Sequence, residues 1–431
     1  MFKKLLQFIL KISAQAVLKK YKPFVIGVTG SVGKTSTKEA VYCILRGRFS
    51  ENKIRRNMKN YNNEIGVPLT ILGQESGGRS LFGWLNIFSA TMRLILLKKD
   101  YPEVLILEMG ADKPGDIKYL TDFIKCKIGI ISAVGDIPVH VEFYATSAQL
   151  AREKAVLAQS ILENGYVILN YDDEAVRKMR EKTKVKILTY GFEQGADIRA
   201  FNFELHDIFS GGHRVSFKIE YQGKTMPVRL SGILGEHQVY ALLAGIAVGT
   251  IFDMNLIEII GALENYQSPR GRMRLLGGIK NSWIIDDTYN ASPTSMLGAL
   301  ETLGSIKIQD DNRKIAVLGD MTELGQFTER AHRIVGGKTF KIADVIFTVG
   351  LRAKFIADEA KKQGFSEKNI FEFDRADDVK ESVQNIIKEG DIVLVKGSQS
   401  MRMEKIIEEI MAEPLRANEL LVRQDDIWKK K

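Results

Sequence analysis

The stretch "VIGVTGSVGKTSTKEA", residues 25–40, decides the fold of the first part of the chain. A short apolar run ends in a glycine-rich turn, and a helical pattern begins at Lys34 and Thr35. Such a turn binds phosphate because its glycines let backbone N–H groups approach the anion, while the N-terminus of the helix points at it. The spacing departs from GxxxxGK[ST], since Val28 occupies the position of the first glycine. The stretch predicts a nucleotide site in an α/β fold.

The residues of this loop have separate predicted roles. Lys34 would neutralise the outer phosphates, and Thr35 would bind Mg²⁺. Glu108 ends the apolar run "VLILE", where an acid is costly unless it meets a cation, so it is a second candidate Mg²⁺ ligand. No guanine-reading Asn-Lys-x-Asp is present, which argues against a GTPase switch. The predicted nucleotide-binding residues of the loop are Gly30, Ser31, Val32, Gly33, Lys34, Thr35 and Ser36.

Two series of apolar runs divide the rest of the chain. The first series ends its runs in Gly or Asp, as buried parallel strands do, and comprises residues 24–30, 104–110, 128–135 and 166–173. Residues 196–232 alternate with period two, which predicts a small antiparallel appendage. The second series lies between 283 and 397 and has the rhythm of a doubly wound sheet. We therefore predict a nucleotide-binding α/β domain over 23–266 and a doubly wound, Rossmann-like domain over 267–411.

The termini and one insertion lie outside these two units. Residues 1–22 predict an amphipathic helix, residues 412–431 a charged tail, and residues from about 73 to 100 an insertion. The apolar stretches 1–20 and 80–97 are too short or too interrupted to cross a bilayer. Either they lie on a membrane surface, or they pack on each other or on the body.

Bulk composition agrees with a folded intracellular protein. The chain has 431 residues, 45% of them hydrophobic, and a formal net charge of +9, which would suit nucleic acid, a membrane surface or an anionic substrate. Its two cysteines, Cys43 and Cys126, lack a CxxC partner and exclude a disulfide framework. We expect buried thiols and a cytoplasmic location, with possible association with a membrane.

Seven motifs occur in order and resemble the Mur ligase family. They are "GVTGSVGKTSTKE" at the loop, "NMKNYNNEIGVPLTIL" (57–72), "LEMGADKPGDI" (107–117), "SPRGRMRLL" (268–276), "DDTYNASPTSM" (286–296), "VLGDMTELG" (317–325) and "VKGSQSMRME" (395–404). The resemblance implies a central ATP-binding domain over 23–266 and ATP-dependent amide formation, in which ATP phosphorylates a carboxylate and an amine displaces the phosphate. It also implies small-molecule substrates, such as D-Ala-D-Ala and a peptidoglycan-precursor carboxylate, and no nucleic acid.

The resemblance also assigns roles to individual residues. Arg272 at the domain junction would meet the γ-phosphate, and Asp287 and Asn290 would approach the nucleotide from the second domain. His140 would serve a second Mg²⁺ ion, and Lys154 would be carbamylated and bind metal. The implied catalytic set is therefore Lys34, His140, Lys154 and Arg272, and the implied metal set is Thr35, Glu108, His140 and Lys154. The implied substrate residues are Asn60, Asn62, Asn63, Asp320, Lys396 and Ser398.

Several departures from the family pattern put the substrate in question. About 22 residues precede the first strand, so we expect no N-terminal domain for a UDP-sugar. Gln238 and Ala241 stand where the family usually has Asn, and Gln399 stands where Arg is common. Three alternatives therefore stay open: a different or lipid-linked acid, sugar-nucleotide recognition by a partner chain, and a non-catalytic nucleotide-binding subunit.

Overall fold

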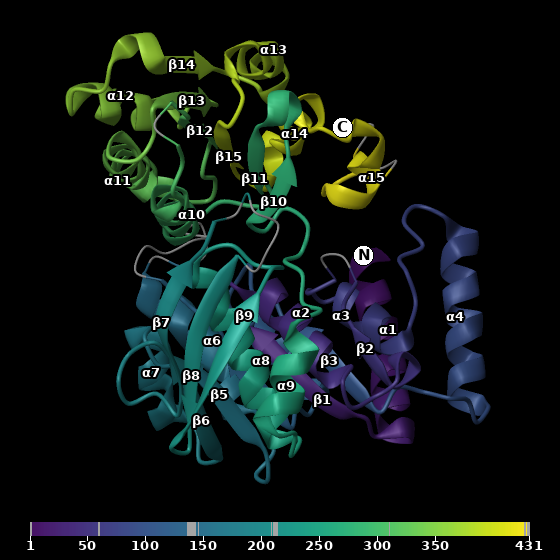
Figure 1. The fold of residues 1–431 in the computed structure, drawn as a ribbon. Helices are drawn as coiled ribbons and strands as arrows, with labels where there is room; N and C mark the ends of the chain where they lie inside the picture. Colours follow the sequence, from purple (N-terminus) through teal and green to yellow (C-terminus); the bar gives the residue numbers. More distant parts are fainter. Residues whose placement is uncertain are drawn as a thin grey trace.

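Two β-sheets, each covered by helices on both faces, form the two lobes that lie one above the other in Figure 1. The computed structural model describes residues 2–58, 61–135, 144, 146–207, 209, 214–309, 311–425 and 428. The predicted α/β architecture with a large, mostly parallel first sheet and a second sheet is confirmed.

The first sheet has nine strands in the order β2-β3-β1-β4-β5-β6-β7-β8-β9. Strands β1 to β7 pair in parallel, whereas β8 and β9 pair antiparallel, as the period-two pattern of residues 196–232 predicts. This appendage continues the edge of the same sheet. The strands are β1 (Phe24–Thr29), β2 (Ile54–Arg56), β3 (Val104–Glu108), β4 (Ile128–Ile131), β5 (Tyr166–Asn170), β6 (Lys186–Gly191), β7 (Ile198–Leu205), β8 (Val215–Tyr221) and β9 (Lys224–Leu230).

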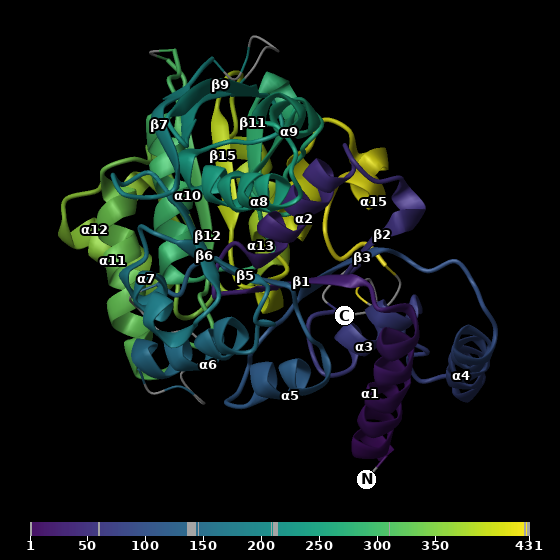
Figure 2. The same ribbon diagram turned by 90° about the horizontal axis from the view of Figure 1, so that it is seen from below.

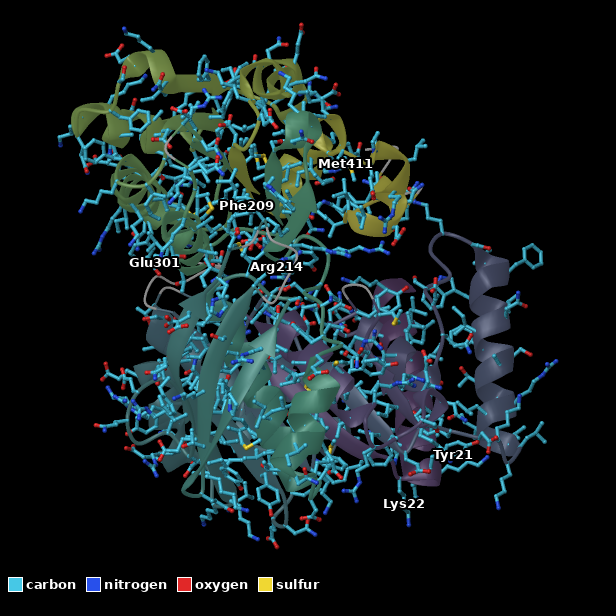
Figure 3. All side chains as sticks on the ribbon, in the orientation of Figure 1. Tyr21, Lys22, Phe209, Arg214, Glu301 and Met411 are labelled. Atoms are coloured by element: carbon cyan, nitrogen blue, oxygen red, sulfur yellow. The ribbon has the colours of Figure 1, made fainter. Side chains whose placement is uncertain are left out.

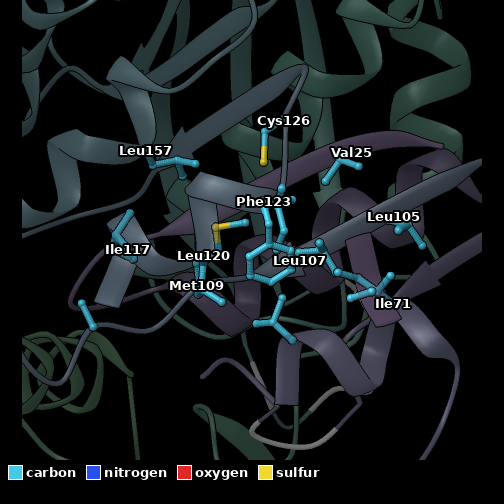
Figure 4. Packing of buried hydrophobic residues seen from close by; sticks show 14 of the residues in the cluster. Val25, Ile71, Leu105, Leu107, Met109, Ile117, Leu120, Phe123, Cys126 and Leu157 are labelled. Carbon is cyan, nitrogen blue, oxygen red and sulfur yellow. The ribbon is translucent and has the colours of Figure 1, made fainter. Parts of the chain in front are cut away.

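Two apolar clusters cover the two faces of this sheet. One face is packed by α2 (Lys34–Leu45), α8 (Val239–Ile251) and α9 (Leu256–Leu263). The other is packed by α1 (Phe2–Tyr21), α3 (Gly66–Leu72), α5 (Asp116–Phe123) and α6 (Ser147–Gln159). Figure 4 shows this second cluster, in which Leu107 lies among side chains from α3 and α5. Because both faces are covered, the strands read as continuous apolar runs.

The second sheet has six strands in the order β10-β11-β15-β12-β13-β14, with β10 antiparallel and the others parallel. The strands are β10 (Arg274–Gly277), β11 (Trp283–Asp287), β12 (Lys314–Gly319), β13 (Val345–Val349), β14 (Ile370–Phe373) and β15 (Ile392–Lys396). One face carries α10 (Pro293–Ser305), α11 (Thr328–Phe340) and α12 (Lys354–Lys362). The other carries α13 (Ala376–Ile386) and α14 (Glu404–Ile410).

The two lobes contact each other through side chains as well as through the connecting chain. Phe209, from the segment after β7, lies against Trp283 of the second sheet, with 5.6 Å between the ring centroids. Figure 3 places Phe209 and Arg214 at this junction.

Two peripheral elements complete the fold. Helix α1 packs on the first lobe through Leu6, Leu10, Ala14 and Val17, and α4 (Leu81–Leu96) stands at the outside of the molecule (Figures 1 and 2). Of the helices in the described part of the chain, none is long and apolar enough to cross a bilayer. After α14 the chain forms α15 (Ala417–Leu420), and Leu420 and Leu421 are buried in the core of the second lobe.

Candidate active site

The glycine-rich loop follows β1 directly and leads into α2. Gly30 has φ +146°, and a Cβ atom there would lie 2.1 Å from Oγ of Ser132, so the neighbouring chain can approach this closely only because residue 30 is glycine. Gly33, with φ 87°, precedes the first turn of α2. Lys34 donates to the carbonyls of Gly30 at 2.8 Å and Ser31 at 3.3 Å, which holds its ammonium inside the loop. The loop thus combines a cation with the N-terminus of a helix, an anion site.

Glu108, at the carboxyl end of β3, lies beside Thr35. The Thr35 hydroxyl donates to the Glu108 carboxylate at 3.0 Å, and Asn62 donates to its other oxygen at 3.1 Å. Burial alone raises the pKa of Glu108, but the ammonium groups of Lys38 and Lys34 outweigh burial and lower it. Glu108 is therefore a buried, ionised carboxylate next to a hydroxyl.

Lys154 lies on α6 and is 2% exposed. Burial lowers the pKa of its ammonium to about 7, and the charge of Lys34 acts in the same direction. The neighbouring Glu153 accepts hydrogen bonds from the backbone N–H groups of Gly115 and Ile117, both at 2.9 Å, and so joins α6 to the start of α5. A buried lysine with so low a pKa is uncharged for much of the time at pH 7 to 8.

Arg272 lies in the segment that connects the lobes and reaches the loop. Its Nη2 donates to the Thr35 hydroxyl at 3.4 Å, and its guanidinium stacks on Tyr289, 3.9 Å from the ring centroid. Within the described residues, its buried Nε has no hydrogen-bond partner. The backbone of this segment is held from both lobes: Gln238 donates to the Arg272 carbonyl at 2.8 Å, and Asp287 accepts from Met273 N–H at 3.1 Å.

The second lobe provides the opposite wall through the carboxyl ends of β11 and β15. Lys396 forms an ion pair with Asp287 at 2.6 Å and donates to the carbonyl of Asn290 at 2.8 Å. Burial lowers the pKa of Lys396, while Asp287 opposes that shift. These charged groups are buried and paired, so they form a rigid wall.

A cavity of about 530 Å³ lies between the loop and this wall. Its lining includes Lys34 and Ser36 from the first lobe, and Asp287, Asn290 and Lys396 from the second. That volume is within the range of roughly 300–1,000 Å³ typical of small-molecule sites. The phosphate loop opens into this cavity, which is therefore the candidate nucleotide site.

Family comparisons agree with this geometry. The model of the Mur ligase middle domain matches residues 28–82 and 87–249, and the model of the Mur ligase, glutamate ligase domain matches residues 271–399. The chain belongs to the Mur ligase family. The predicted activity class, an ATP-dependent ligase that forms amide bonds, is thereby confirmed.

Individual Mur ligases are similar over most of the chain. The UDP-N-acetylmuramoyl-tripeptide–D-alanyl-D-alanine ligase of Bacillus subtilis (strain 168) is 28% identical over 404 residues, which cover 93% of this chain and 79% of the relative. A crystal structure of MurF from Acinetobacter baumannii is 25% identical with a TM-score of 0.75, covering 93% of this chain and 79% of that one. The crystal structure of MurF from Thermotoga maritima in complex with ADP is also 25% identical with a TM-score of 0.75, and the match covers 94% of this chain and 83% of that one.

The structure brings most of the residues expected for a Mur ligase into two groups. Lys34, Thr35, Asn62 and Glu108 lie together, with Arg272 in contact with Thr35. The second group, Asp287, Asn290 and Lys396, faces the loop across the nucleotide cavity.

Five predicted residues have other surroundings or cannot be placed. Asn63 accepts backbone hydrogen bonds from Ile65 at 3.2 Å and Gly66 at 2.9 Å at the start of α3. Asp320 accepts from the backbone N–H of Arg352 and Ala353, and Ser398 accepts from Thr322 N–H at 2.9 Å. Their expected contact with substrate stays a prediction. Asn60 and His140 lie outside the described residues.

Sequence reasoning missed several residues of the site. Lys38 is 2% exposed, donates to the Asn57 carbonyl at 2.7 Å and lies 3.9 Å from Glu108. On the nucleotide side, Asp172 accepts from the Tyr240 hydroxyl at 2.8 Å, and His237 lines the same cavity. Asp172 lies two residues after the strand "YVILN", and an acid at the carboxyl end of a parallel strand was a usable signal.

The donor set fits Mg²⁺ and a nucleoside triphosphate. A hydroxyl and an ionised carboxylate are oxygen ligands of the kind that Mg²⁺ binds, usually together with phosphate oxygens and water. Across the described ranges there is no group of three His, Cys, Asp or Glu side chains that would hold a metal alone. Thr35 and Glu108 would therefore hold the ion together with the nucleotide.

Proposed function

We propose that this Mur ligase activates a carboxylate of a peptidoglycan-precursor peptide with ATP and joins it to an amine such as D-Ala-D-Ala. The observation that carries the proposal is the buried group formed by Lys34, Thr35 and Glu108 with Arg272, which reaches it from the segment between the lobes. The relatives that match over most of this chain are named for that reaction.

The arrangement suits phosphoryl transfer to a carboxylate. Lys34 would hold the outer phosphates, and Mg²⁺ bound by Thr35 and Glu108 would neutralise charge on them. Arg272 adds a cation where negative charge grows as the phosphoryl group moves to the acid. A carboxylate is a poor electrophile, and the resulting acyl phosphate has a leaving group that the amine can displace. Closely apposed lobes would keep water from this intermediate.

The test is ADP release that depends on an acid and an amine together. UDP-N-acetylmuramoyl-tripeptide and D-Ala-D-Ala are assayed first, then other acids and amines, and the product is identified by mass spectrometry. We expect turnover that Lys34→Ala abolishes and that Lys118→Ala, at an exposed lysine of α5, retains. The absence of ADP release with every pair would refute the ligase and favour a nucleotide-binding subunit. Turnover that requires a second protein would point to a partner chain that recognises the sugar nucleotide.

Lys154 is proposed to carry a carbamate that serves a second Mg²⁺ ion, together with His140. Its support is its burial on α6 within electrostatic reach of Lys34. Carbamylation would convert a buried cation into a carboxylate-like ligand. We expect Lys154→Ala to lose turnover and to regain part of it with added formate or acetate. We also expect ¹³C-bicarbonate to label the protein that retains Lys154. Failure of both rescue and labelling would contradict this role.

We also propose that α1 and α4 contact an anionic membrane surface. Helix α1 has two apolar stripes: one is buried against the first lobe, and the other exposes Leu5, Phe8 and Ile12. Helix α4 exposes Phe82 and Leu85, and Lys20 joins it to α1 through the carbonyls at its C-terminal end. Exposed apolar side chains among lysines are typical of interfacial helices. Such contact would suit a lipid-linked acid.

Flotation with phosphatidylglycerol vesicles tests membrane contact. We expect the protein to float with these vesicles and not with phosphatidylcholine alone. Phe82→Glu should abolish flotation, whereas Leu351→Glu, at a leucine of the second lobe that is 71% exposed against 80% for Phe82, should not. A protein that stays at the bottom with both helices intact would refute membrane contact.

A further inference from the structure

A second cavity adjoins the nucleotide site at Arg272. Its volume is about 1110 Å³, and Arg272 lines both cavities. Lys34 faces the nucleotide cavity, whereas Thr35 and Lys38 face the second one. The Thr35–Arg272 contact therefore stands between the two spaces, where a terminal phosphate would meet a carboxylate arriving from the second cavity.

The C-terminal segment forms one wall of this second cavity. The first lobe contributes residues on either side of Tyr61 and Tyr61 itself: Arg56, Asn57, Met58, Tyr61, Asn63, Ile65, Gly66 and Leu69. The opposite wall consists of residues from the chain terminus: Asn418, Leu421, Val422, Arg423, Gln424, Asp425 and Trp428. Figures 1 and 2 both place this end of the chain on the side of the molecule where α3 lies.

Buried contacts fix this wall to the second lobe. Arg423 pairs with Glu404 at 2.7 Å, with side chains 4% and 0% exposed, and it also donates to the Tyr289 carbonyl at 3.0 Å. Glu404 in turn pairs with Arg402 at 2.6 Å, and Arg402 donates to the Trp428 carbonyl at 2.9 Å. One buried carboxylate thus orders the middle of the wall, at Arg423, and its end at Trp428.

The wall also contacts the segment that carries Arg272. Arg270 donates to the Asn418 carbonyl at 3.0 Å. Arg423 holds the carbonyl of Tyr289, and the ring of Tyr289 lies under the Arg272 guanidinium. The C-terminal segment is therefore tied to the residues that would contact the reacting groups.

We propose that residues 417–425 and Trp428 are a specificity element for the acid substrate, with Trp428, Gln424 and Asp425 contacting the part remote from its reacting carboxylate. This inference rests on the proposed ligase reaction. The cavity exceeds the range of roughly 300–1,000 Å³ typical of drug-sized ligands, so it suits an extended peptide better than a dipeptide amine. Its lining combines the basic side chains Arg270 and Arg272 with the aromatic rings of Tyr61 and Trp428, which fits an anionic peptide with apolar portions. Arg56 also lines the cavity but pairs with Glu39 at 2.8 Å.

The first test uses the tryptophans of the full chain. The chain has three tryptophans, and the double substitution Trp84→Phe and Trp283→Phe leaves Trp428 as the single remaining one. The probe is UDP-N-acetylmuramoyl-tripeptide, added with ADP and Mg²⁺. We expect a saturable shift in Trp428 emission with the probe and no shift with D-Ala-D-Ala alone.

The outcomes separate this inference from the proposed function. Emission that stays unchanged at probe concentrations that support ADP release overturns the specificity element and leaves the ligase standing. A saturable shift without ADP release supports the element and counts against the ligase with this pair. If the probe causes no shift and no ADP is released, both the specificity element and the proposed ligase reaction are refuted.

A kinetic test gives an independent readout. Trp428→Ala should raise KM for the acid about tenfold, equivalent to about 1.4 kcal/mol, while kcat and KM for ATP change less than about threefold. Leu415→Ala is the matched control, since this residue is 97% exposed and lies outside the cavity lining. An equal rise in KM for ATP, or an unchanged KM for the acid, would overturn the assignment.

Discussion

Replacing Lys154 with Met should stabilise the protein more at pH 7 than at pH 9. The ammonium has a folded-state pKa of about 7 against a usual value of 10.5, because burial and the charge of Lys34 disfavour its charged form. Between pH 7 and pH 10.5, the folded protein therefore binds fewer protons at Lys154 than the unfolded chain does. The stability of the unmodified protein therefore rises with pH across this window, and the destabilisation is greatest below pH 7.

The size of the effect follows from those two pKa values. At about 1.36 kcal/mol per pKa unit, keeping Lys154 buried costs about 4 kcal/mol at pH 7 and about 2 kcal/mol at pH 9. The packing change caused by Met is the same at both pH values and cancels in the comparison. The stabilisation by Lys154→Met should therefore shrink by about 2 kcal/mol between pH 7 and pH 9.

Urea unfolding in buffers free of carbon dioxide measures this difference, since a carbamate would add a new charge. Lys118→Met, at an exposed lysine of α5, is the control and should follow the unmodified protein at both pH values. The variant and the parent protein could instead show the same change in free energy of unfolding from pH 7 to pH 9. In that case the conclusion that burial lowers the pKa of Lys154 would be wrong.

Four further substitutions test other parts of the structure. Lys34→Ala should reduce ATP turnover at least about 100-fold in a steady-state ADP assay, and an unchanged rate would remove Lys34 from the site. Arg272→Lys should lower kcat about 100-fold with little change in KM for ATP, because a single ammonium does not replace the guanidinium. Leu10→Ala should destabilise the protein by about 2–5 kcal/mol in urea titrations, since this side chain is fully buried where α1 meets the first lobe. Glu404→Gln should cost about 3–5 kcal/mol and release the C-terminal segment to proteases, because it leaves the buried Arg423 without a carboxylate; unaltered proteolysis would contradict that anchoring role.

The parts of the site that sequence predicts are those that follow strands. The loop after β1 and Glu108 at the end of β3 lie on adjacent parallel strands, so their approach follows from strand order alone. Asp287 and Lys396 likewise end the neighbouring strands β11 and β15. The periodicity of the chain predicted these strands, and the order of the strands in each sheet then brings their final residues together.

The parts that sequence does not predict depend on contacts between distant segments. Lys38 resembles any lysine on a helix, and its burial is evident only once the segment carrying Asn57 packs across α2. Trp428 stands in a charged stretch for which the sequence predicts a loose tail or a terminal helix, and neither alternative indicates that Arg423 pairs with a buried carboxylate on α14. Long-range ion pairs leave no periodic signal in a sequence.

Gln238 illustrates how a departure from the family pattern can be accommodated by the fold. Its side-chain oxygen accepts from Leu234 N–H and the Ser268 hydroxyl, both at 2.9 Å, and its nitrogen donates to the Arg272 carbonyl. The first lobe thus holds the connecting segment through one buried amide. Asp287 holds the next residue, Met273, from the second lobe. The hydrogen bonds from Gln238 and Asp287 thus attach the connecting segment to both lobes. A rotation of one lobe relative to the other that kept these bonds would move Arg272 together with this segment. The contact between its guanidinium and Thr35 therefore depends on the relative orientation of the lobes.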